Sequence, residues 1–292
     1  MSLKLRYLLL AAGVVLLALP GAAQSSPQRH LPPSQVACAN FFSPHGYRSV
    51  LRIIGARGGT EVSMFTTGDI LYLNHAGRFQ PGDQLRLMRV VTPGQDQEQF
   101  PGQSSVLHRM GTFFEVVGRA RVLRVDQNQV ALARMTFSCQ PARVGDFAIA
   151  WRPNPNPTLP RVANVNWIAP VRGTSQLVAM GRDMAGNLGR GDEMYLTGGA
   201  AVGAHVGQVW TIFRRHDSPS NWQFKTESEG MTASSNHPES GVNTAALRSL
   251  PQPADVLGRA VIIRVEPRSA TAVITVSRAP ILVGDQAVPT GR

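Results

Sequence analysis

An internal repeat is the feature that most constrains the fold of this 292-residue chain. Four short blocks in the first half occur again, in the same order, in the second half. The paired blocks are 68–73 with 191–196, 81–89 with 206–214, 117–125 with 257–265, and 144–149 with 283–288. Self-similarity of this kind is typical of a duplicated structural unit, so we expect two tandem homologous modules.

The blocks show the alternation of apolar and polar residues that indicates β-strands. Residues 121–125 and 261–265 alternate in this way, and turn-forming residues follow each of them. A second apolar stretch then returns, at 130–137 and 270–276, so each module contains a hairpin. We find no convincing amphipathic helix. The sequence therefore predicts an all-β fold of two small antiparallel β-barrels or sandwiches, each on the scale of an SH3 domain.

A Gly-Asp pair opens most of the blocks. Glycine reaches positive φ at a tight turn, and the aspartate carboxylate can accept hydrogen bonds from nearby backbone N–H groups. The pairs are Gly68 and Asp69, Gly82 and Asp83, Gly145 and Asp146, Gly191 and Asp192, and Gly284 and Asp285. These acids could be read as a catalytic constellation. However, Gln208 stands where the repeat calls for an acid, and a catalytic carboxylate could not become an amide, so we interpret the pairs as structural turns.

The N-terminus predicts export. Basic residues precede an apolar run, 7–19, which has the length of a signal-peptide core and is short for a membrane span. Small residues follow, so we expect residues 1–23 to be a signal peptide, with an uncleaved membrane anchor as the alternative. No later apolar run is long enough for a transmembrane helix. The polar, proline-containing residues 24–36 are expected to form a disordered leader.

The expected β-modules are 37–151 and 162–292. Between them, a proline-rich linker at 152–161 should be extended and semi-rigid. Each module carries an insertion between its second and third blocks, short at 92–111 and about forty residues long at 216–256.

The long insertion is a candidate recognition segment. It is polar, and Trp222, Phe224 and Lys225 give it aromatic and basic character. Long loops in compact domains are usually functional or disordered. Binding of a partner or glycan is therefore one interpretation, and a mobile loop tucked onto its own barrel is the other.

The chain has two cysteines, Cys38 and Cys139. An even count in an exported protein favours one disulfide, with two separate buried thiols as the alternative. The bridge would close a loop of about 100 residues and stabilise the fold by roughly 4–5 kcal/mol in the chain-entropy model.

The chain is strongly basic, with a formal net charge of +11, and nearly all the positive charge is arginine. Expected export argues against nucleic acid as the partner and leaves lipid headgroups, lipopolysaccharide phosphates and wall polymers. Five arginines on the third-block strands are candidates for such binding: Arg119, Arg121, Arg124, Arg259 and Arg264. Since the arginines are spread along the chain without a block of five, a merely solvated surface is the alternative.

No motif for catalysis, a cofactor or a metal is found in the sequence. The histidines are scattered without ligand spacing, and no Gly-x-Ser-x-Gly elbow occurs. The glycine-rich stretch 186–191 precedes a predicted strand and lacks the Gly-Lys-Ser/Thr ending of a phosphate-binding loop. We therefore predict a non-enzymatic protein with no cofactor and no metal. An enzyme whose site follows no known motif is the alternative.

The order of features within each module resembles a known family. A Gly-Asp strand start, a strand ending in Arg, a variable insertion, a Gly-initiated hairpin and a closing Gly-Asp strand are similar to the C-terminal domain of flagellar assembly protein T. They also resemble related β-modules of bacterial envelope proteins that carry LysM domains. The resemblance covers 81–149 and 206–288, and it implies a periplasmic β-module.

These observations predict a non-enzymatic periplasmic scaffold or adaptor in a bacterial envelope assembly, with a protein assembly or a cell-wall polymer as its partner. The alternative is direct binding of an anionic glycan or lipid surface through the arginine-bearing strands. The oligomeric state is left open by the sequence.

Overall fold

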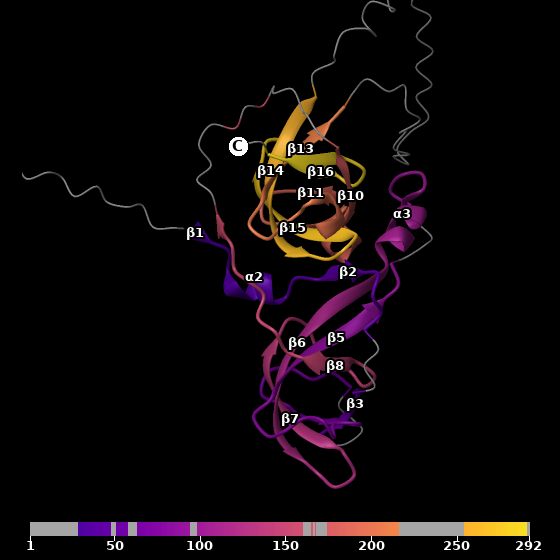
Figure 1. Cartoon of the computed structure of the whole chain (residues 1–292), viewed down its shortest axis with the longest axis vertical. Coiled ribbons are helices and arrows are strands. Elements are labelled where there is room, and N and C mark those ends of the chain that lie inside the picture. The colour runs from indigo at the N-terminus through magenta and orange to yellow at the C-terminus, as the bar shows by residue number, and fades with distance from the viewer. Residues whose placement is uncertain are drawn as a thin grey trace, which may run out of the picture.

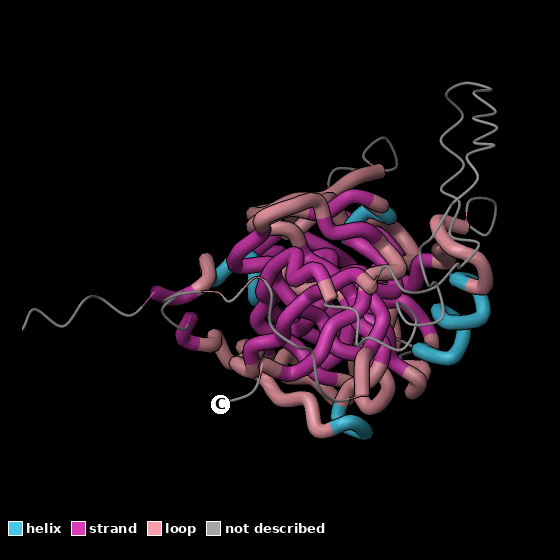
Figure 2. The backbone as a smooth tube through the Cα atoms, turned by 90° about the horizontal axis from the view of Figure 1, so that it is seen from above, coloured by secondary structure: helices cyan, strands magenta, loops and turns pink. Residues whose placement is uncertain are grey.

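The structure is a computed structural model, and it describes residues 29–47, 51–57, 63–93, 98–159, 165, 167, 174–215 and 254–290. Two β-sheets account for most of these residues and are stacked along the long axis of the molecule (Figure 1). Seen from above, the strands form a compact centre with short helices at its periphery (Figure 2). The predicted all-β class is confirmed. None of the helices in the described ranges is long and apolar enough to cross a membrane.

The first sheet has the strand order β3-β4-β7-β6-β5-β8, and β2 pairs with β6 outside this path. Its strands are β2 (Phe41–Ser43), β3 (Ile53–Ala56), β4 (Ile70–Leu73), β5 (Gln84–Val91), β6 (Thr112–Val125), β7 (Ala131–Ser138) and β8 (Phe147–Ala150). Its two edges meet, because the Ile53 N–H donates to the carbonyl of Asp146 at 2.8 Å and the Gly145 N–H donates to that of Ile53 at 2.9 Å. We call this sheet the first barrel.

The second sheet is a closed antiparallel barrel with the order β10-β12-β15-β14-β13-β17. Its strands are β10 (Gln176–Gly181), β12 (Glu193–Thr197), β13 (Val209–Arg214), β14 (Asp255–Val265), β15 (Ser269–Ser277) and β17 (Gln286–Pro289). A small separate sheet pairs β11 (Asn187–Leu188) with β16 (Ile281–Leu282). Two short 3-10 helices, η2 (Arg182–Met184) and η3 (Ala200–Val202), flank β12. We call the closed sheet the second barrel.

The two barrels have the same strand order when the strands of the sequence blocks and the returning strands are matched. β3 and β10, which lie in no block, then occupy the same place in the two orders. The matched pairs are β3 with β10, β4 with β12, β7 with β15, β6 with β14, β5 with β13, and β8 with β17. The long third-block strands even shift register at matching places, between Val122 and Arg124 in β6 and between Ile262 and Arg264 in β14. A duplication of one unit would produce this correspondence.

Each barrel is filled by the inward residues of its alternating strands. Leu71, Leu85, Val122 and Met135 belong to the first core. Trp210, Met194, Ile262 and Ile274 belong to the second, and all eight side chains are buried. Burial of this apolar area is the main source of stability for each barrel.

Residues 29–36 are not the disordered leader that their composition suggested. β1 (Arg29–His30) pairs with β9 (Thr158–Leu159), and α2 (Pro33–Ala37) follows it with a proline in its first turn. Leu31 and Val36 are buried in one cluster with Ile263 and Val273 of the second barrel. The prediction was wrong for these residues because their apolar partners lie more than 200 positions away in the chain.

The predicted linker runs along this N-terminal segment in its described part. Residues 151–157 have no regular secondary structure, as expected of an extended connection. The amide groups of Asn154 and Asn156 donate hydrogen bonds to the carbonyls of Val36 (3.1 Å) and Leu31 (3.0 Å). The connection between the barrels is thus fixed by tertiary contacts as well as by its prolines.

The short insertion of the first module contains a helix that the sequence analysis missed. α3 (Gln103–Met110) follows β5, and the Gln103 side-chain amide donates to the carbonyl of Ala179 in the second barrel at 2.9 Å. Val106 and Met110 are buried in a cluster that also holds Phe42 and Tyr195. This insertion therefore helps to join the two barrels. The region where the two barrels meet is called the junction below, and α3 lies at its edge (Figure 1).

Candidate functional site

The predicted turn residues lie at tight turns. The five glycines all have positive φ, between 93° and 102°. Each aspartate accepts a hydrogen bond from the backbone N–H three residues earlier. These bonds are Thr66 to Asp69 (2.7 Å), Gln80 to Asp83 (2.9 Å), Arg143 to Asp146 (2.8 Å), Gly189 to Asp192 (2.8 Å) and Leu282 to Asp285 (2.7 Å). Gln208 stands in place of the aspartate at the matching turn of the second module. Its side-chain oxygen accepts a hydrogen bond from the His205 backbone N–H at 3.3 Å, so an amide can also close this turn.

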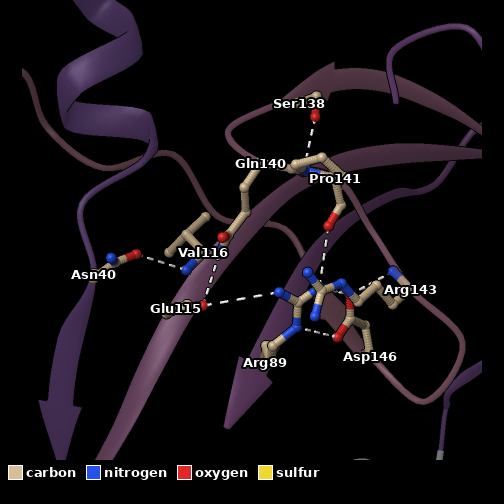
Figure 3. Close-up of polar contacts among 9 residues, drawn as sticks. All are labelled: Asn40, Arg89, Glu115, Val116, Ser138, Gln140, Pro141, Arg143 and Asp146. Carbon is tan, nitrogen blue, oxygen red and sulfur yellow. Dashed lines mark hydrogen bonds and ion pairs between the residues drawn. The ribbon is translucent and has the colours of Figure 1, made fainter. Parts of the chain in front are cut away.

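Two of these aspartates also bind the arginine at the end of the second sequence block, Arg89 or Arg214. Nε and Nη2 of Arg89 donate to both oxygens of Asp146, each at 2.8 Å, as Figure 3 shows. Arg214 binds Asp285 in the same way, at 2.7 and 2.8 Å. These hydrogen bonds raise the pKa of both arginines. The carboxylates are thereby occupied as structural groups and are not free for acid–base chemistry.

The predicted disulfide is confirmed. Cys38 and Cys139 are joined, with their Cα atoms 5.5 Å apart and a separation of 101 positions in sequence. The bridge fastens the end of α2 to the first barrel just after β7. It therefore holds the N-terminal segment, which we define as residues 30–43, covalently to one barrel.

The structure does not gather the five candidate arginines on one face. Arg121 and Arg124 are exposed on the first barrel. Arg119 is half-buried, with its guanidinium 5.0 Å from the centre of the Trp151 ring, and Arg259 is also half-buried. Arg264 is only 9% exposed and cannot belong to an outward binding surface. Arg264 was a wrong candidate because Phe41 of the N-terminal segment covers it, whereas the matching Arg124 of the first barrel is exposed.

The other candidate binding residues lie in the long insertion. Trp222, Phe224 and Lys225 fall outside the described residues, and the structure therefore places none of them. The same holds for the predicted signal peptide at 1–23.

The N-terminal segment lies between the barrels (Figure 1), and its Asn40 hydrogen-bonds to both of them. Its side-chain oxygen accepts from the Val116 N–H of the first barrel at 2.8 Å, as drawn in Figure 3. Its backbone N–H donates to Glu193 at 3.0 Å, and its carbonyl accepts from the Thr271 hydroxyl at 2.8 Å. Ser269 adds a hydrogen bond from its hydroxyl to the carbonyl of Phe42 at 2.7 Å. Asn40 is 4% exposed, so these bonds are shielded from water.

Glu193 is the buried acid of this junction. Its side chain is 1% exposed, and the Tyr195 hydroxyl donates to it at 2.7 Å. The Arg182 guanidinium lies 3.4 Å away. Burial raises the pKa of Glu193 from 4.5 to about 7, although Arg182 and the two hydrogen-bond donors oppose the shift. A carboxyl group with this pKa suits proton transfer, but here the N-terminal segment covers it.

Two buried arginines meet at the other side of the junction. Arg264 stacks on Phe41, with its guanidinium carbon 3.2 Å from the ring centre, and donates to Glu266 at 3.0 Å. Arg86 donates to the carbonyl of Arg152 at 2.5 Å. Burial and the nearby charge of Arg264 lower the pKa of Arg86 to about 10. These contacts tie β14 to Phe41 of β2 and tie β5 to the linker.

The described surface has two notable hollows. One, of about 130 Å³, is lined by Arg86, Arg119, Phe137 and Trp151 beside α2. The other, of about 290 Å³, lies between the end of β5 and α3. Within the described ranges, no group of three or more His, Cys, Asp or Glu residues could hold a metal ion. Ser104 and His108 line the second hollow one turn apart on α3, and the Ser104 side chain hydrogen-bonds to Glu98.

Sequence reasoning missed the residues of the junction. The available signal was a mismatch inside the repeat, because Glu193 stands where the first module has Ile70. A charged residue at a strand position that is apolar in the sister module indicates a different environment for that position.

Comparison of the chain with protein-family models finds no match. Comparison with curated proteins finds no similar sequence either. The junction and the surfaces of the two barrels are therefore the features that bear on function.

Proposed function

We propose that this protein is a non-enzymatic periplasmic scaffold or adaptor that holds partners at fixed spacing in a bacterial envelope assembly. The observation that carries the proposal is the junction, where Asn40 hydrogen-bonds both barrels while Cys38 is bridged to Cys139. A scaffold requires its binding surfaces to keep a constant relative position. A covalently anchored, buried segment between two barrels supplies that rigidity.

The disulfide supports the periplasmic part of the proposal. Stable disulfides form in oxidising compartments such as the bacterial periplasm and are rare in the cytosol. The apolar run at 7–19 provides the means of export. The resemblance to envelope β-modules points to the same compartment, and the wall-associated form of the role follows from that resemblance alone.

The alternative role, direct binding of anionic glycan or lipid through the arginine-bearing strands, has less support. It requires several arginines on one surface, and of the five candidates only Arg121 and Arg124 are exposed.

The test is fractionation followed by affinity isolation from the periplasm of the native bacterium. We expect the mature protein there, together with one protein partner in a fixed ratio that remains bound when the salt concentration is raised severalfold. Binding to wall fragments or anionic vesicles that is lost steeply with salt, with no protein partner, would favour the alternative. Recovery of the full-length chain from the cytosol would contradict both roles.

A further inference from the structure

The outer face of the first barrel has a counterpart on the second barrel. The cross-strand pairing of matched strands identifies the residues that correspond. In the first barrel Tyr72 pairs with Leu132, and Leu132 pairs with Arg124. In the second barrel the matching row is Tyr195, Thr271 and Arg264.

A second row lies beside the first. It consists of Ile70, Arg134 and Arg121 in the first barrel. Its counterpart in the second barrel is Glu193, Val273 and Val261. We call the two rows of the first barrel the Tyr72 face and their counterpart the Tyr195 face.

The Tyr195 face is a docking surface for the N-terminal segment, which contacts it with Val36 of α2 and with Asn40 just after that helix. All six of its residues are buried, at 9% exposure or less. The N-terminal segment covers this face at Glu193 and Thr271 through the backbone of Asn40, and Phe113 of β6 packs on Tyr195 with their ring centres 5.1 Å apart. Apolar contacts of Val273 with Leu31 and Val36 extend the surface. The outer face of such a barrel can therefore bind a peptide segment, as the Tyr195 face binds the N-terminal segment.

The Tyr72 face is open in the described structure. Tyr72 is 36% exposed, and the neighbouring Leu123 and Ile54 are 39% and 49% exposed. Arg121, Arg124 and Arg134 are exposed as well. Among the described residues, no carboxylate forms an ion pair with any of these three arginines. Tyrosine and arginine beside exposed aliphatic side chains are the residue types that dominate protein interfaces.

The charge of the Tyr72 face identifies the class of occupant. Where the Tyr195 face has Val261 and Val273, the Tyr72 face has Arg121 and Arg134. The occupant must therefore bring negative charge as well as apolar side chains. A second copy of this chain fits poorly, because each copy carries a formal net charge of +11.

We propose that the Tyr72 face binds an acidic segment of a partner protein, as the Tyr195 face binds the N-terminal segment. This inference rests on the proposed scaffold function and names the partner class. Carboxylates of the partner pair with the three arginines, and its apolar side chains pack on Tyr72, Leu132 and Leu123. The apolar part of the contact allows binding to persist when salt screens the ion pairs.

The test uses the full mature protein and a labelled peptide of about eight alternating glutamate and valine residues, roughly the length of a long strand. We expect saturable binding by fluorescence anisotropy, with NMR amide shifts centred on β4, β6 and β7. The variant R124E/R134E should bind about tenfold more weakly or worse. The matched control R190E/R268E makes the same charge change at exposed positions of the second barrel and should bind within about twofold of wild type.

Two further measurements keep the proposal open to refutation. Tyr72→Ser leaves every charge in place and should also weaken the peptide, which separates a specific face from general charge attraction. Peptide shifts located elsewhere, equal losses in both charge variants, or binding of anionic lipid vesicles in place of the peptide would overturn the proposal.

The capture experiment separates this proposal from the scaffold role. If R124E/R134E still captures the periplasmic partner fully, the Tyr72 face is not the binding site while the scaffold role stands. If wild type captures none, the scaffold role itself fails.

Discussion

The backbone N–H of Asn40 donates a hydrogen bond to the carboxylate of Glu193, 153 residues further along the chain, at 3.0 Å. This bond joins the segment that is anchored on the first barrel to a strand of the second. Because burial raises the pKa of Glu193 to about 7, the strength of the junction depends on pH.

The first prediction is that the Glu193 carboxyl becomes destabilising as pH rises. Its pKa is about 7 in the folded chain and 4.5 in the unfolded one, so between these values the folded state binds more protons. The free energy of unfolding therefore falls from pH 4.5 to 7, by about 3 kcal/mol at most from this group. Tyr195, Arg182 and Asp183 are the charged or titratable groups acting on it.

Glu193→Gln isolates this effect, because the amide does not titrate. Urea unfolding at pH 5 and pH 7.5 should show the variant gaining stability relative to wild type at the higher pH. A difference between variant and wild type that stays constant across this range would show that Glu193 titrates normally in the fold.

The second prediction concerns the disulfide between Cys38 and Cys139. Replacing both cysteines by serine should lower the free energy of unfolding by about 4–5 kcal/mol, because the bridge closes a loop of about 100 residues. Urea unfolding of the variant and of reduced wild type should give the same midpoint, well below that of the oxidised protein. Equal midpoints for all three samples would contradict a structural role for the bridge.

The third prediction concerns the two glycines at matching bulges, Gly118 and Gly258. A Cβ at either position would lie 2.3 Å from a backbone carbonyl oxygen, that of Phe137 or Val276. Each Gly→Ala change should cost about 1–3 kcal/mol, because the strands must move apart. Gly55 is the control, since nothing lies within 4 Å of its Cβ position. Thermal melts should show a drop for the first two variants and little change for Gly55→Ala.

The fourth prediction concerns the pair of Arg214 and Asp285. Asp285 is 6% exposed and accepts from the guanidinium and from the Leu282 N–H, so Asp285→Asn should cost about 2 kcal/mol in unfolding free energy. This figure is reduced for the one-third exposure of Arg214. Asp83→Asn is the matched control, because the exposed Asp83 only closes its turn. A double-mutant cycle with Arg214→Met measures the pair itself, and a coupling energy near zero would refute its contribution.

Features that depend on neighbouring residues could be predicted from the sequence. Glycine before aspartate determines a tight turn because positive φ and a carboxylate three residues from its donor are local requirements. The hairpin of β6 and β7 follows from alternation around a turn. The disulfide between Cys38 and Cys139 was predicted from the presence of two cysteines in a chain that we expect to be exported.

The environment of each outer strand face was decided only by the tertiary structure. Arg124 and Arg264 occupy matching positions, yet the first is exposed and the second is buried under Phe41. Glu193 and Leu31 are likewise defined by partners far away in the chain. The reason is that burial of an outward residue depends on which distant segment covers it, and the N-terminal segment covers this face on the second barrel alone.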